Sequence, residues 1–154
     1  MSNVVDFERV SFYRTPKESP GFLLWHVSTH WRSAIEETLK GLNLTHPQFV
    51  ILATVSWLTK NKQHVSQVEI GQHAGLDPNT TSQILRGLEA KNFIERVRSI
   101  DERSKNPTLT AMGTETLIKA LPAVEKADMI FFQSLQKDEL SALIVIFQKL
   151  VEER

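Results

Sequence analysis

The segment from Asp77 to Arg86 most constrains the fold, because its composition is typical of a helix whose outer face reads another molecule. The Asp77 carboxylate can accept hydrogen bonds from the first free backbone N–H groups, and Pro78 suits a first helical position that needs no donor. The residues that repeat at helical spacing on one apolar face are Thr81, Ile84, Leu85 and Leu88. We therefore expect an amphipathic helix that begins at Pro78.

The opposite face of this helix lacks the Glu and Lys residues that a solvated helix usually carries. It presents short neutral hydrogen-bonding groups and one guanidinium, which suit base edges and phosphates. Gln83 could pair with adenine and Arg86 with guanine or a phosphate, and the sequence does not choose between these contacts. The DNA-contacting residues that we assign to this helix are Pro78, Asn79, Thr80, Ser82, Gln83 and Arg86.

A shorter helix is expected just upstream, because Ser66-Gln-Val-Glu69 has the capping-box spacing. Its inward-facing residues would be Val68, Ile70 and Ala74. Gly75 would then end it in the left-handed conformation, and a new helix would start at once. Two helices joined by so short a turn form a helix-turn-helix.

A β-hairpin is expected after the helix that begins at Pro78, which we call the reading helix. Residues 93–100 are rich in β-branched and aromatic side chains, and residues 108–110 would form the returning strand. Asn92 would adopt the left-handed conformation between helix and strand. Pro107 has no N–H donor and fits only an edge position. Residues 64–65 would form a short strand that pairs with the hairpin.

Long helices are expected on both sides of this region. The first would cover residues 22–42, and a second would follow the cap at Thr45. Residues 111–135 would form another helix, kinked or restarted at Pro122. The last, about residues 137–152, has an apolar surface too wide for one neighbour, which indicates that a second chain covers it.

Charge and composition exclude several classes of protein. The chain has 154 residues, a single-domain length, with 18 basic and 18 acidic residues, so DNA contacts must come from placement rather than bulk charge. No cysteine occurs, which excludes disulfides and thiolate metal sites. No signal peptide or membrane-length apolar run is present, so we expect a cytoplasmic protein without membrane contact.

No catalytic motif or cofactor loop occurs, so we expect neither an enzyme nor a bound cofactor. His26 and His30 have the spacing of two ligands of one metal, but no third ligand is evident. We interpret them as packing or pocket residues and expect no metal. His46 and His73 are expected at the surface.

Beyond these patterns, the chain resembles the MarR-type (multiple antibiotic resistance regulator) winged helix-turn-helix transcription factors of bacteria. The residues that carry the resemblance are Gly75-Leu76, Thr80 to Ser82, Leu88-Glu-Ala-Lys91, Ile94-Glu-Arg96, Asp101-x-Arg103-x-Lys105 and Leu109-Thr110-x-x-Gly113. Three positions depart from the family pattern. They are Gly71, where alanine is common, Asn92, where glycine is usual, and Pro107.

The resemblance implies a mainly α fold with a small β-hairpin wing, of the α+β class. Residues 1–20 would form an N-terminal arm, 21–43 a first dimerisation helix, 44–110 the winged helix-turn-helix and 111–154 the C-terminal dimerisation helices. The first and last helices of two subunits would interdigitate into a two-fold homodimer.

Such a dimer would be a repressor that binds a pseudo-palindromic operator in double-stranded DNA, with half-sites about 10 bp apart. In the wing, Arg103 would enter the minor groove and Asp101 would orient its guanidinium. Arg98 and Lys105 would contact phosphates. The alternative is a winged-helix module that binds another protein through the same face, which the zero net charge allows.

In this family, regulation usually comes from an aromatic acid or similar small molecule bound between the dimerisation helices and the reading domain. The aromatic residues that could line such a pocket here are Trp25, His30, Trp31, Phe49 and Trp57. An ordinary role in the core is an equal alternative for them.

Overall fold

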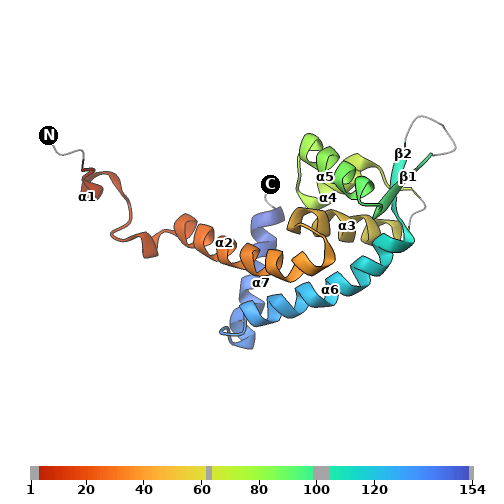
Figure 1. The fold of residues 1–154 in the computed structure, drawn as a ribbon. Coiled ribbons are helices and arrows are strands. Elements are labelled where there is room, and N and C mark those ends of the chain that lie inside the picture. Colours follow the sequence, from red (N-terminus) through yellow and green to blue (C-terminus); the bar gives the residue numbers. More distant parts are fainter. Residues whose placement is uncertain (1–3, 62–63, 99–104, 153–154) are drawn as a thin grey trace.

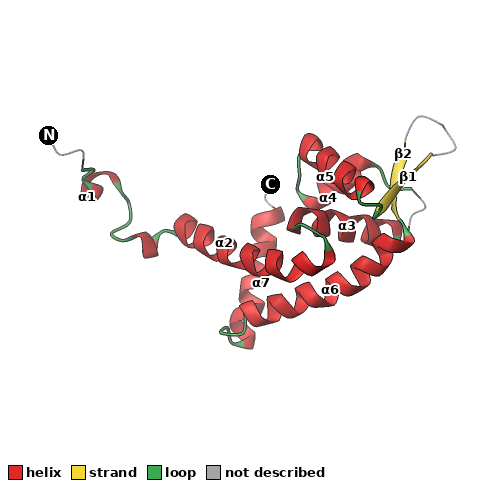
Figure 2. Ribbon diagram, viewed as in Figure 1, coloured by secondary structure: helices red, strands yellow, loops and turns green. Residues whose placement is uncertain are grey.

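The computed structural model describes residues 4–61, 64–98 and 105–152, without the side chains of Arg98 and Lys105. It is mainly helical with one antiparallel hairpin, which confirms the expected fold class (Figures 1 and 2). The elements are α1 (Phe7–Val10), η1 (Pro16–Glu18), α2 (Pro20–Leu39), η2 (Lys40–Leu42), α3 (His46–Thr59), α4 (Gln67–Ala74), α5 (Pro78–Ala90), β1 (Ile94–Arg98), β2 (Lys105–Leu109), α6 (Ala111–Phe131) and α7 (Lys137–Glu152).

Local capping chemistry sets the helix starts. Thr45 and Ser66 each form a complete capping box with the glutamine or glutamate three residues later, at the starts of α3 and α4. Asp77 caps α5. Gly75 and Asn92 adopt the left-handed conformation, with φ of 67° and 59°. The predicted helix-turn-helix is therefore confirmed, including the role of Asn92.

α3 lies at the centre of the fold. Ile51, Leu52 and Val55 of this helix are fully buried. On one side of it lie α4, α5 and the hairpin, and on the other lie α2 and α6 (Figure 1). The helix-turn-helix and the long helices therefore share one hydrophobic core.

The hairpin pairs β1 with β2 in the register Ile94↔Leu109, Arg96↔Pro107 and Arg98↔Lys105. The returning strand starts three residues earlier than predicted. Because the sheet in the described residues has two strands, Pro107 stands on an edge, as its missing donor requires.

Two other sequence predictions are wrong. Residues 64–65 form no strand; Val65 is instead a core residue with 1% of its surface exposed. In α4, Ile70 is buried as expected, but Val68 is 62% exposed. Residues on one face of a helix are three or four positions apart, so Val68, only two before Ile70, lies on the opposite, solvent-facing side of α4.

α6 does not restart at Pro122 but runs through it as one curved helix (Figure 1). Pro122 and Ile118 are both exposed, so the carbonyl that loses its helical hydrogen bond lies on the solvent side. No helix in the described part of the chain is long and apolar enough to cross a membrane.

Candidate nucleic-acid interface

The first turn of α5 is held by its cap. The Asp77 carboxylate accepts a hydrogen bond from the Thr80 backbone N–H at 2.9 Å and another from the Thr80 hydroxyl. These two bonds lower the pKa of Asp77. The Thr80 hydroxyl proton is thereby used in the cap. In this arrangement Thr80 can accept a hydrogen bond from a base but cannot donate one to a base or phosphate.

The inner face of α5 is buried as predicted. Thr81, Leu85 and Leu88 are fully buried, and Ile84 is partly buried. The Thr81 hydroxyl donates to the Asp77 carbonyl at 2.8 Å. A Cβ on Gly71 of α4 would lie 2.7 Å from that hydroxyl oxygen. Glycine at position 71, a departure from the family pattern, therefore lets α4 approach α5 closely.

The outer face of α5 is open. Pro78, Asn79, Gln83 and Arg86 are exposed, and Ser82 is half-buried. The Arg86 Nε donates to the Ser82 carbonyl at 3.4 Å, and within the described residues its terminal nitrogens have no partner. This face therefore presents one guanidinium and several neutral polar groups, a set suited to base edges.

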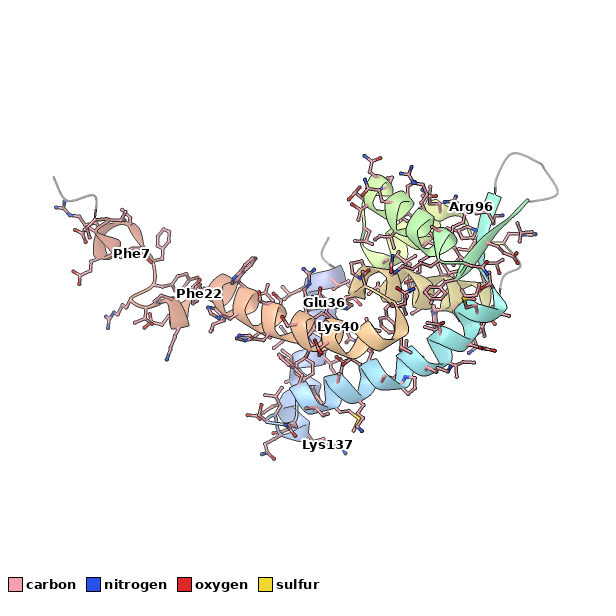
Figure 3. The ribbon with its side chains drawn as sticks, in the orientation of Figure 1. Phe7, Phe22, Glu36, Lys40, Arg96 and Lys137 are labelled. Atoms are coloured by element: carbon pink, nitrogen blue, oxygen red, sulfur yellow. The ribbon has the colours of Figure 1, made fainter. Side chains whose placement is uncertain are left out.

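Arg96 of β1 connects the hairpin to both helices of the helix-turn-helix (Figure 3). Its Nε donates to Glu89 at 3.2 Å, and its Nη1 donates to Gln67 at 3.3 Å. These contacts fix the hairpin against α5. Sequence reasoning missed this role, because the partners are 7 and 29 residues away along the chain.

Lys91, directly after α5, is also used internally. Its Nζ donates to the Asn43 carbonyl and to the Gln48 side chain, both at 2.8 Å. Two of the five basic residues between positions 91 and 105, Lys91 and Arg96, are therefore bound within the protein. Arg96 is paired with the Glu89 carboxylate, whereas Lys91 keeps its charge and is held in place by two neutral acceptors.

The wing carries the other predicted contacts. Asp101 and Arg103 lie outside the described residues. Arg98 and Lys105 are paired opposite each other in the ladder, and their side chains are outside the described part. The DNA contacts assigned to these four residues stay predictions.

The end of α5 and the start of α6 are joined at Thr110. Its hydroxyl donates to the Asn92 carbonyl at 2.7 Å, and its backbone N–H donates to the Phe93 carbonyl at 3.1 Å. The same hydroxyl accepts from the Gly113 N–H and caps α6. Thr110 thus links the start of α6 to the turn that connects α5 with β1.

Farther along α6, an apolar cavity of about 380 Å³ lies between α2, α6 and α7. Its lining residues are Leu24, Val27, Ser28, Trp31, Asp128, Phe132 and Phe147. The Trp31 Nε1 donates to the Asp128 carboxylate at 2.7 Å. Asp128 was not expected at such a site, since it lies 97 residues from Trp31.

Of the five predicted pocket residues, the structure places only Trp31 in the wall of this cavity. Trp25 and Trp57 are 68% and 64% exposed, Phe49 is in the core, and His30 is exposed. The structure thus does not gather the five around one space. A ligand contact by the other four stays a prediction.

The histidines differ from one another. The rings of His26 and His30 are 6.0 Å apart, and no group of three potential metal ligands gathers in the described part of the chain. The expectation that His46 is a surface residue is wrong. It is 8% exposed and packs edge-on against Trp31, with ring centroids 4.9 Å apart. This burial, helped by nearby Arg32, lowers the pKa of His46.

Comparison with known proteins agrees with this geometry. A family model described as transcriptional regulator SarA/Rot matches residues 33–121, more than half of the chain. The HTH-type transcriptional regulator YdcH of Bacillus subtilis is 35% identical over 130 residues, 84% of this chain and 88% of its own. The HTH-type transcriptional repressor Rv2887 of Mycobacterium tuberculosis is 33% identical over 109 residues, 70% of this chain and 76% of its own.

Rv2887, a MarR family protein, has been solved in complexes with small aromatic acids and with DNA. The one with p-aminosalicylic acid has a TM-score of 0.65 and 29% identity, covering 86% of this chain and 98% of that one. The complex with DNA has a TM-score of 0.64 and 26% identity, covering 86% and 97%.

Proposed function

This chain belongs to the MarR family of winged helix-turn-helix transcriptional regulators, and on that premise we propose that it is a dimeric repressor of a pseudo-palindromic operator. One observation supports the proposal above the others: the exposed side of α5 from Pro78 to Leu88 carries Asn79, Gln83 and Arg86 and no acidic side chain, and the helix's one acidic residue, Glu89 in its last turn, is paired with Arg96. Neutral polar side chains together with one guanidinium suit the major groove, where hydrogen bonds identify bases.

A second copy of the chain is proposed to cover α7. This helix has no buried residue, and Val145, Leu150 and Val151 are 55%, 57% and 75% exposed. Leu24 of α2, 57% exposed, lines one apolar groove together with Phe131 at the end of α6 and Leu150 of α7. Contiguous apolar area of this kind marks an interface. Sedimentation should give a dimer at micromolar concentration. A monomer would contradict the proposal that the operator has two half-sites.

We further propose that a small aromatic effector binds among α2, α6 and α7, the helices that carry this interface. The cavity beside Trp31 supports this, as does the p-aminosalicylic acid complex of Rv2887. A ligand that separates the C-terminal part of α6 from α2 would tilt α6, whose N-terminal cap Thr110 is hydrogen-bonded to Asn92 in the turn after α5. The spacing of the two reading helices in the dimer would then change.

The decisive test is selection of duplexes from a random-sequence pool, followed by anisotropy titrations at two salt concentrations. We expect an inverted repeat with half-site centres about 10 bp apart. Arg86→Ala should weaken binding by about 1–3 kcal/mol. The matched control is Lys119→Ala, an exposed cation on α6. No enriched sequence, or equal binding by both variants, would favour a protein-binding module instead.

A further inference from the structure

The cavity between α2, α6 and α7 also constrains the charge of what can bind there. Its walls are hydrocarbon apart from three polar groups: the Ser28 hydroxyl, the Trp31 indole and the Asp128 carboxylate. The lining residues include no lysine, arginine or histidine. Within one protomer, a ligand that enters therefore finds its polar partners among these three groups.

Both proton donors in this wall are already used. The Ser28 hydroxyl donates to the Trp25 carbonyl at 3.1 Å, and the Trp31 Nε1 donates to Asp128 Oδ1 at 2.7 Å. The other Asp128 oxygen, Oδ2, accepts from no group in the described part of the chain. The wall that one protomer contributes thus has an acceptor to offer, and its donors are already used.

A ligand carboxylate would be poorly matched to this wall. It would lose hydration without gaining a donor, and it would approach the negative charge of Asp128. An amine or hydroxyl group would instead donate to Asp128 Oδ2 while an aromatic ring filled the apolar space. The volume of about 380 Å³ lies at the small end of ligand pockets, which suits one or two rings.

We propose that the effector of this regulator is a small aromatic compound that carries a hydrogen-bond donor and no negative charge, an aryl amine or alcohol. This inference rests on the proposed function, because it specifies the ligand of the proposed effector site. It separates this chain from an acid-binding relative such as Rv2887, whose solved ligand, p-aminosalicylic acid, has a carboxylic acid group.

The test uses three probes of similar size: phenethylamine, phenethyl alcohol and phenylacetate. Binding to the full-length protein is measured at neutral pH by calorimetry, without DNA. Trp31 fluorescence locates the site, in a protein carrying Trp25→Phe and Trp57→Phe, since both of those indoles are exposed. Phenylacetate should bind about tenfold or more weakly than the other two, since its carboxylate would approach the carboxylate of Asp128.

Asp128→Asn tests the cause. The amide oxygen can still accept from Trp31, but the negative charge is gone. The ratio of the dissociation constants of phenylacetate and phenethyl alcohol should therefore fall by about tenfold. Asp138→Asn, an exposed carboxylate at the start of α7, is the matched control and should leave the ranking unchanged. Circular dichroism checks that both variants fold.

Several results would overturn the inference. They are phenylacetate binding as tightly as the amine, the same ranking in Asp128→Asn, or no probe altering Trp31 fluorescence. Ligand binding is measured without DNA, so the two proposals can fail separately. If the three probes bind in the expected order but the protein selects no DNA sequence, the repressor function is refuted and the proposed ligand class is retained.

Discussion

The backbone carbonyl of Phe93 occupies the space that a side chain on Gly113 would need. A Cβ at position 113 would lie 1.9 Å from the Phe93 oxygen and 2.8 Å from the Phe93 carbonyl carbon. Both partners are backbone, which no rotamer change can move. The first turn of α6 therefore packs against the residue that links α5 to β1, and only glycine permits this contact.

Gly113→Ala should for this reason destabilise the protein severely, by about 3 kcal/mol or more, since the backbone must shift. Urea unfolding at a fixed protomer concentration measures the loss. The matched control is Gly21→Ala in α2, where no atom lies within 4 Å of the added Cβ, and helix propensity should stabilise it by up to about 1 kcal/mol. Similar stability of the two variants would contradict the packing.

Gly71→Ala should destabilise through Thr81, because its Cβ would lie 2.7 Å from the Thr81 hydroxyl oxygen and 3.2 Å from the Leu76 carbonyl. We expect a loss of about 1–3 kcal/mol. In a Thr81→Ala background the same change should cost less, and a double-mutant cycle gives the difference. Additive losses would mean that the Leu76 carbonyl, rather than Thr81, resists the new methyl group.

Trp31→Phe should lower stability by about 1–3 kcal/mol, because it leaves the partly buried Asp128 carboxylate without its indole donor. Chemical denaturation measures the change. Trp57→Phe makes the same substitution at a 64% exposed indole and should stay within about 0.5 kcal/mol of the parent. An equal loss in both variants would indicate general aromatic packing instead.

His46 should make stability fall as the solution is acidified. Its folded pKa is lowered from the ordinary 6.5, mainly by burial, so between the two pKa values the unfolded chain binds more protons. Stability from this group is complete above the unfolded pKa and declines as pH falls toward the folded pKa. In His46→Gln that part of the slope should disappear. His73→Gln, at an exposed histidine, should keep it; parallel curves for the parent and His46→Gln would contradict the assignment.

Much of the reading motif could be predicted from the sequence because its determinants are local. Capping at Ser66 and Asp77 and the left-handed turns at Gly75 and Asn92 depend on a few neighbouring residues. The buried face of α5 follows from helical spacing alone. Composition identified the opposite face as the one available to a ligand such as DNA.

What only the tertiary structure decided is which side chains meet across the chain. Trp31 donates a hydrogen bond to Asp128, which is 97 residues away in the sequence, and no pattern or spacing predicts that partner. The internal partners of Arg96 and Lys91 are likewise distant in the sequence: Arg96 donates to Glu89 and Gln67, and Lys91 donates to Asn43 and Gln48. His46 is buried although histidine usually lies nearer the surface, because Trp31 packs over it. Local chemistry sets where an element starts and ends, whereas burial and partner choice depend on how distant elements pack.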